Sequence, residues 1–174
     1  MSLDAKPVGR RTFTFDPSSI RLQTDARLVI VQGKGDFAGL GGEWIWQHSS
    51  SSRENMKGAS GLLAVVLRDE LARRFPYVYG PRSSSEASEA TVLLTPTLLV
   101  SPDLDGDSRL EFEVVHMLTK AVRKFNFKTS VGREKLGYEG IVRFDVEAAD
   151  LAVKAASSPE VLEFLVSATQ AIRD

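Results

Sequence analysis

Residues 91–101 read Thr-Val-Leu-Leu-Thr-Pro-Thr-Leu-Leu-Val-Ser, and residues 109–119 read Arg-Leu-Glu-Phe-Glu-Val-Val-His-Met-Leu-Thr. The first stretch is strongly apolar. The second alternates apolar and polar residues with the period of two of a strand that buries one face. Asp105-Gly106 between them is a turn signal. We therefore predict that the two stretches form a β-hairpin, with Pro96 at a sheet edge or in a bulge because proline cannot donate a ladder hydrogen bond.

The second stretch has an alternative interpretation as a helix over 108–125. Ser108 and Glu111 have the spacing of a capping box. Apolar residues follow at helical spacing, namely Val114, Val115, Leu118, Val122 and Phe125. We favour the hairpin, and a helix over 108–125 would overturn it.

Two segments outside the hairpin have the apolar period of amphipathic helices. The first is 58–75, with Ser60 or Asn55 as its cap and Pro76 as its stop. The second begins with Ser158 as its cap and Pro159 at its first position. We predict that their apolar stripes are buried, in particular Leu63, Val66, Leu67, Leu162 and Leu165.

Shorter segments complete the expected fold. Strands are predicted at 27–32, 77–79, 124–131 and 141–146, and a helical region is predicted from Asp145 or Asp150 to Lys154. The fold class that follows is α+β: a two-layer sandwich with a mainly antiparallel sheet covered on one face by two helices. Residues 1–25, with a short strand at Phe13–Phe15, form an N-terminal arm, and residues 26–174 form a single domain.

The composition excludes several classes of function. Lys and Arg total 22, Asp and Glu total 23, and the net charge of −1 gives no overall field that favours nucleic acid, so we expect none as a partner. Cysteine is absent, which excludes disulfides, thiolate metal sites and cysteine catalysis. No apolar run approaches the roughly 20 residues of a membrane-spanning helix.

A long Gly-, Trp- and Ser-rich loop is expected at 33–57. Glycines stand at 33, 35, 39, 41 and 42, and both tryptophans of the chain fall in this stretch. Loops of this length in a compact domain are usually functional. We predict that Phe37, Trp44 and Trp46 bind a protein partner, because large aromatic side chains dominate binding hot spots. The alternative is that the tryptophans pin the loop to the sheet edge.

The same loop has an alternative interpretation as a nucleotide or small-molecule site over residues 33–42. Gly33-Lys-Gly35-Asp-Phe-Ala-Gly39 follows a predicted strand, but the spacing is one residue too long and no helix is predicted to begin there. His48 and His116 have no partner at metal-ligand spacing. We therefore predict no cofactor, no metal and no catalytic residue.

One basic cluster stands out in the second half of the chain: Lys120, Arg123, Lys124 and Lys128. The simplest interpretation is a solvated face. Phe125 and Phe127 alternate with these basic residues and could stack nucleic-acid bases. An orientation of both rings toward the core fits their spacing equally well.

From about Arg27 to Ile172 the order of elements resembles that of small bacterial envelope lipoproteins. The group includes lipopolysaccharide-transport and polysaccharide-export accessory lipoproteins and the N-terminal domain of the Tol–Pal propeller protein. In these, a strand and a helix precede an antiparallel meander, here 91–131, and a closing helix. The segment Glu89-Ala-Thr-Val-Leu-Leu94 resembles the start of their second long strand. The present chain departs from them in lacking a lipid-bearing cysteine, in the length of loop 33–57 and in Pro96.

The resemblance implies a non-catalytic accessory or assembly protein of the periplasm or outer membrane. Its partner would be an envelope protein or further copies of itself. Membrane attachment would come from an N-terminal lipid anchor that the sequence does not include. A cytoplasmic location is the alternative that the sequence leaves open.

Overall fold

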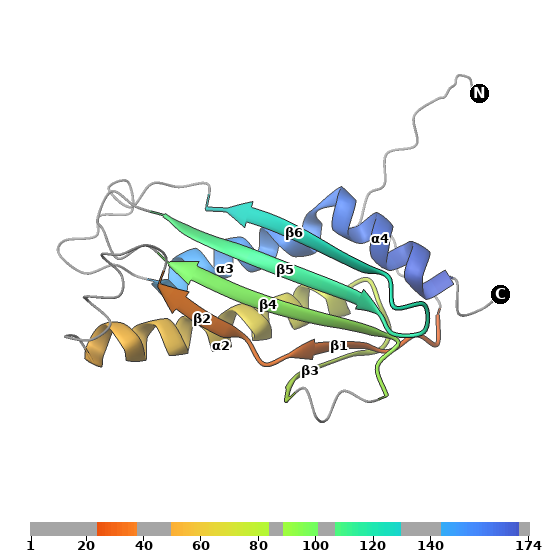
Figure 1. The fold of residues 1–174 in the computed structure, drawn as a ribbon, viewed down its shortest axis with the longest axis horizontal. Helices are drawn as coiled ribbons and strands as arrows, with labels where there is room; N and C mark the ends of the chain where they lie inside the picture. The colour runs from red at the N-terminus through yellow and green to blue at the C-terminus, as the bar shows by residue number, and fades with distance from the viewer. Residues whose placement is uncertain (1–23, 38–49, 84–88, 101–106, 130–143, 171–174) are drawn as a thin grey trace, which may run out of the picture.

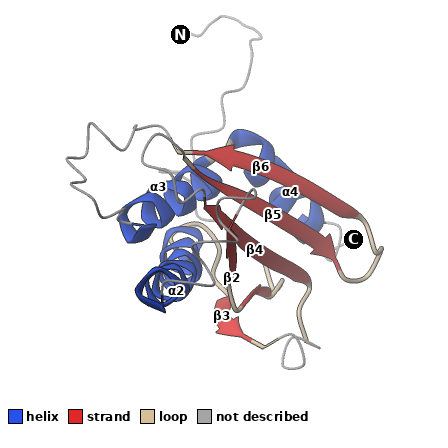
Figure 2. Cartoon of the chain, turned by 60° about the vertical axis from the view of Figure 1, so that its left-hand side comes forward, coloured by secondary structure: helices blue, strands red, loops and turns tan. Residues whose placement is uncertain are grey.

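The computed structural model describes residues 24–37, 50–83, 89–100, 107–129 and 144–170. They form two layers, a six-stranded sheet and three helices that lie together on one of its faces (Figures 1 and 2). The predicted α+β two-layer sandwich is therefore confirmed. Three helices cover the sheet face where two were expected, and the additional one, Phe144–Ser157, includes the helical region predicted up to Lys154. The predicted arm, including the strand at Phe13–Phe15, lies almost wholly outside the described residues.

The sheet has the strand order β3-β1-β4-β5-β6, and β2 pairs with β4 beyond the end of β1. Along the chain the elements are β1 (Leu28–Val31), β2 (Lys34–Phe37), α2 (Ser50–Ala72), β3 (Val78–Arg82), β4 (Val92–Val100), β5 (Ser108–His116), β6 (Val122–Lys128), α3 (Phe144–Ser157) and α4 (Pro159–Gln170). The sheet is antiparallel over β4, β5 and β6. It is parallel where β1 joins β3 and β4 and where β2 joins β4.

The predicted hairpin is confirmed by the pairing of β4 with β5. Their register runs without interruption from Val92 opposite His116 to Val100 opposite Ser108. The alternative helix over 108–125 is therefore wrong. The turn expected at Asp105-Gly106 lies outside the described residues.

Pro96 lies in a central strand, opposite a bulge. β1 pairs with β4 up to Ile30 opposite Leu94, and β2 resumes the pairing at Lys34 opposite Thr97. The chain of β1 and β2 thus advances four residues, 30 to 34, while β4 advances three, 94 to 97. The expected edge position is wrong, and Pro96 is not itself in a bulge, because the extra residue lies in the chain of β1 and β2 opposite it.

The direction of the strand amides explains why proline is tolerated at this point. The Val92 amide donates to the Arg27 carbonyl at the start of β1, over 3.2 Å. Successive strand amides point to opposite sides, so an amide at position 96 would point toward the β1–β2 side as well. The missing N–H of Pro96 therefore falls where the ladder on that side is already interrupted.

The helix boundaries differ from the expected ones. α2 ends at Ala72, three residues before the predicted end at Phe75. α2 begins at Ser50, so Asn55 and Ser60 lie inside the helix and are not its cap. The strand predicted over 141–146 is wrong for its described part, because α3 already begins at Phe144. Asp145 and Glu147 occupy the first turn of α3, where the helix dipole stabilises negative charge.

The expected interruption before the last helix is confirmed. α3 ends at Ser157, α4 begins at Pro159, and the Val161 amide donates to the Ser158 hydroxyl over 3.5 Å. Ser158 therefore caps α4 as predicted.

The core lies between the helices and the face of the sheet that they cover. Of the five residues predicted to be buried, Val66 is partly buried and the others are fully buried. They pack against alternate residues of β4 and β5, namely Val92, Leu94, Leu98, Val100, Leu110, Phe112 and Val114. The apolar stripes identified in the sequence are thus the ones that join the two layers.

Candidate functional site

Of the predicted binding residues, only Phe37 is among those that the structure describes, and it lies at one end of the sheet. Phe37 is the last residue of β2, with its backbone opposite Val100 of β4. Trp44 and Trp46 lie in segment 38–49, outside the described residues. The loop expected over 33–57 is shorter than predicted, because β2 occupies 34–37 and α2 begins at Ser50. In Figure 1 the end of β2 and the start of α2 both lie at the left of the molecule.

Two glycines of the Gly-rich stretch have a packing role. A Cβ atom at Gly33 would lie under 3.0 Å from the Ser60 carbonyl oxygen of α2. At Gly35 it would contact Met56, also on α2. These glycines allow the chain to approach α2 closely. The described part of the stretch therefore does not favour the nucleotide interpretation, because 34–37 form a strand and not the start of a helix.

Charged residues surround the start of β5 at the same end of the sheet. One carboxylate oxygen of Asp107 lies 3.5 Å from Arg109, and the other lies 3.4 Å from Lys128 of β6. Both basic side chains are well exposed. Exposed ion pairs of this kind contribute little to stability, so the group mainly sets the charge of this surface.

Beneath these charges lies a buried polar contact that joins the two layers. The Ser108 hydroxyl, at the start of β5, donates to a carboxylate oxygen of Glu147 on α3, and both side chains are buried. A buried carboxylate is costly unless hydrogen bonds satisfy it. The contact therefore fixes the first turn of α3 against β5.

We expect Ser108→Ala to lower the free energy of unfolding by about 1–3 kcal/mol, because it removes a donor from a buried carboxylate. Equilibrium urea denaturation measures the change. Ser157→Ala is the matched control, since Ser157 is exposed at the end of α3. Equal effects of the two substitutions would show that the Ser108–Glu147 contact contributes nothing specific.

His116 is buried at the end of β5, on the same face as Leu110, Phe112 and Val114. Its Nδ1 atom lies 2.7 Å from the Thr119 hydroxyl, and its Nε2 atom has no hydrogen-bond partner among the described residues.

Among all the residues that the structure describes, no three His, Asp or Glu side chains are grouped as a metal site would require. Nor is any helix there long and apolar enough to span a bilayer.

Phe125 and Phe127 of β6 face the helices. Phe125 is buried, and its ring meets that of Phe164 on α4 edge to face, with centroids 6.4 Å apart. Phe127 is partly buried against the same core. The core interpretation of these rings is therefore correct, and they are not available to stack on bases.

No family of known proteins matches the sequence, and no curated protein is detectably similar to it.

Several solved structures are similar to that of this chain. A neuraminyllactose-binding hemagglutinin homolog from Helicobacter pylori is 12% identical over 92% of this chain and 98% of its own, with a TM-score of 0.52. PelC from Paraburkholderia phytofirmans, a dodecamer, is 11% identical over 76% of this chain and 90% of its own, with a TM-score of 0.38. A lipoprotein from Neisseria meningitidis is 11% identical over 86% of this chain and 99% of its own, with a TM-score of 0.24. The last two scores are too low to indicate a common fold, whereas the first shows that the chain is similar in overall fold to the Helicobacter protein.

Proposed function

We propose that the chain is a non-catalytic accessory or assembly protein of the bacterial cell envelope that binds a protein partner or associates with itself. The observation that supports this most is the fold that it has in common with a hemagglutinin homolog over nearly the whole of both chains. That protein is named for binding and not for catalysis. The element order that resembles accessory lipoproteins and the Tol–Pal propeller's N-terminal domain points in the same direction.

Phe37, Trp44 and Trp46 are the binding residues of this proposal. Two regular elements flank segment 38–49: β2 is hydrogen-bonded to β4, and α2 is packed on the core. Binding side chains on a segment between rigid elements are a common arrangement, because the scaffold limits the entropy lost on binding. Two tryptophans only two positions apart in the chain can supply much of the affinity of a small interface.

We expect the double substitution Trp44→Ala with Trp46→Ala to abolish self-association or partner binding while the melting temperature hardly moves. Each aromatic ring buried at a hot spot contributes roughly 2 kcal/mol or more to binding. Sedimentation velocity measures the oligomeric state, and chemical crosslinking in the envelope fraction of the source cells measures partner contacts. Circular dichroism follows thermal unfolding.

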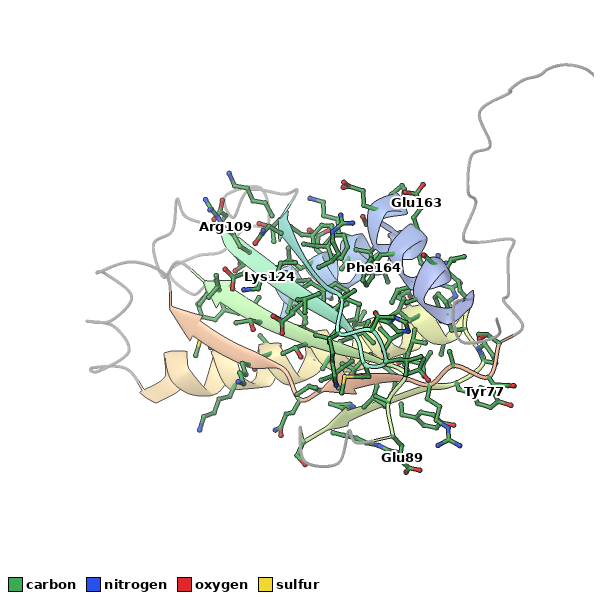
Figure 3. The ribbon with its side chains drawn as sticks, turned by 45° about the vertical axis from the view of Figure 1, so that its right-hand side comes forward. Tyr77, Glu89, Arg109, Lys124, Glu163 and Phe164 are labelled. Carbon is green, nitrogen blue, oxygen red and sulfur yellow. The ribbon has the colours of Figure 1, made fainter. Side chains whose placement is uncertain are left out.

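Tyr77→Ala is the matched control, because Tyr77 is an exposed aromatic residue just before β3 (Figure 3). It should leave association unchanged. If the double variant unfolds at a much lower temperature and its folded fraction associates normally, the tryptophans belong to the core, and the proposed site is wrong.

The proposed location is the periplasm or the periplasmic side of the outer membrane, with an N-terminal lipid anchor. Expression of the protein from its complete native gene in cells fed a radioactive fatty acid tests this. Label that remains with the protein after denaturing electrophoresis supports the anchor. Unlabelled protein in the cytoplasmic fraction would contradict the proposed location.

A further inference from the structure

The turn between β5 and β6 presents apolar side chains to solvent. Leu118 is 71% exposed and Val122 is 50% exposed. The turn itself is held by the backbone, since the His116 amide donates to the Ala121 carbonyl over 2.9 Å and the Lys120 amide donates to the His116 carbonyl over 2.8 Å. A hydrogen-bonded turn therefore keeps Leu118 at its tip, away from the core.

Basic residues surround this apolar tip. Residues 117–128 contain four basic residues and no acidic one, in a chain whose net charge is −1. Lys120, Arg123 and Lys124 are exposed and make no ion pair with any described residue. The fourth, Lys128, lies at the other end of β6 and is held by Asp107. The local positive charge is thus concentrated beside Leu118.

The three basic side chains lie on both sides of the hairpin. Lys124 lies opposite Glu113, on the face of the sheet that the helices leave open. Arg123 points to the helix side, where its guanidinium lies 5.0 Å from the centre of the Phe125 ring and 5.8 Å from that of Phe164. Lys124 and Phe164 are labelled in Figure 3. A flat negative surface that meets the tip end-on would therefore contact cations on either side of Leu118.

The described chain begins at the same end of the molecule. The Met117 amide donates to the Thr91 carbonyl over 2.9 Å, and the Thr91 amide donates to the Arg27 carbonyl over 2.8 Å. The Thr24 hydroxyl donates to the Thr169 carbonyl near the end of α4, over 3.5 Å. Residues 24–27 therefore lie beside the β5–β6 turn, and Figure 1 shows this end at the right.

We infer that the β5–β6 turn is a docking point for an anionic phospholipid surface. Leu118 and Val122 enter the boundary between headgroups and acyl chains, and Lys120, Arg123 and Lys124 bind the lipid phosphates. This combination of an apolar tip and neighbouring cations matches a bilayer, in which apolar and anionic layers are stacked within a few ångströms. A nucleic acid would leave the apolar tip without a partner, and the rings of Phe125 and Phe127 are not free to stack on bases. The inference does not depend on the proposed protein-binding function.

Vesicle co-sedimentation of the full chain tests this inference, with phosphatidylcholine vesicles compared with vesicles that also contain phosphatidylglycerol. We expect binding to the anionic vesicles only, and weakening of that binding as salt is raised. Lys120→Gln with Lys124→Gln should weaken it about 25-fold, since each basic residue near an anionic bilayer contributes about fivefold. Leu118→Asp should weaken it on the order of tenfold.

Lys57→Gln with Leu62→Asp is the matched control, because both side chains are exposed on α2 in the helical layer, and it should bind like the wild type. Circular dichroism establishes that all the variants are folded. Absence of binding, equal binding to neutral vesicles, or equal loss in the α2 variant would overturn the inference. So would binding of the turn to single-stranded nucleic acid in preference to vesicles. The Trp44→Ala, Trp46→Ala variant should bind vesicles normally, which separates this test from that of the proposed function.

Discussion

Gly80→Ala should lower the free energy of unfolding by about 2–5 kcal/mol. Gly80 has φ +120, a conformation that strains any residue with a side chain by about 1–3 kcal/mol. A Cβ atom there would also lie under 3.0 Å from the Ile30 carbonyl oxygen of β1, and overpacking adds about 1–3 kcal/mol. Both atoms belong to paired strands, so neither can move without disturbing the β1–β3 ladder. Urea denaturation followed by circular dichroism measures the loss.

Gly61→Ala is the control for this substitution. Gly61 lies inside α2, and a Cβ atom there would contact nothing within 4 Å. Because alanine favours the helix over glycine, this variant should be more stable by about 0.5–1 kcal/mol. If both variants changed stability in the same direction, close packing of β3 against β1 would not be the reason for glycine at position 80.

Leu67→Ala should lower the free energy of unfolding by about 2–5 kcal/mol as well. Leu67 is fully buried in the C-terminal half of α2, between the helical layer and the sheet. Truncation removes its apolar contacts and leaves a cavity that a helix packed along its length cannot close. The midpoint of urea denaturation should fall while the slope of the transition stays unchanged.

Leu62 on the same helix provides the comparison. Its side chain is 38% exposed, so Leu62→Ala should cost less than about 1 kcal/mol. A loss under about 0.5 kcal/mol for Leu67→Ala would contradict its place in the core.

The parts of the fold that could be predicted from sequence are those in which the local pattern and the tertiary contacts agree. The alternation over β5 identifies its buried face correctly, from Leu110 to His116. The competing capping box at Ser108 and Glu111 is overruled by tertiary pairing. Ser108 begins β5 and donates to Glu147 of α3, so its hydroxyl is not available as a helix cap.

Other elements could not be predicted, because their stability comes from distant partners. β2 reads Lys-Gly-Asp-Phe and is a strand only because β4 supplies its hydrogen bonds. The serine-rich start of α2 has no apolar period of its own. Residues 144–146 have β-branched and aromatic character, which is typical of a strand. They belong to a helix because Phe144, Ala148 and Leu151 form one buried face of α3 against the core.

The candidate site likewise has parts that could be predicted from the sequence and parts that could not. Composition alone identified the stretch 33–57 as unusual, since five glycines and both tryptophans of the chain lie there. The Ser108–Glu147 contact joins residues 39 positions apart, and the sequence around each of them does not indicate that the two meet. Leu118 falls within the strand predicted over 109–119, and only the end of β5 at His116 shows that its side chain points into solvent.

The charge of β6 limits how copies of this protein can be joined. β6 is the last strand of the sheet, and Arg123, Lys124 and Lys128 lie along it without an acidic residue between Val122 and Lys128. Two such edges brought side by side would place three cations of one copy against three of the next, which destabilises the ladder. Fibril growth by edge-to-edge addition is therefore opposed at this strand. A pair of copies joined β6 to β6 is likewise disfavoured, so two sheets would not merge into one across this pair of edges.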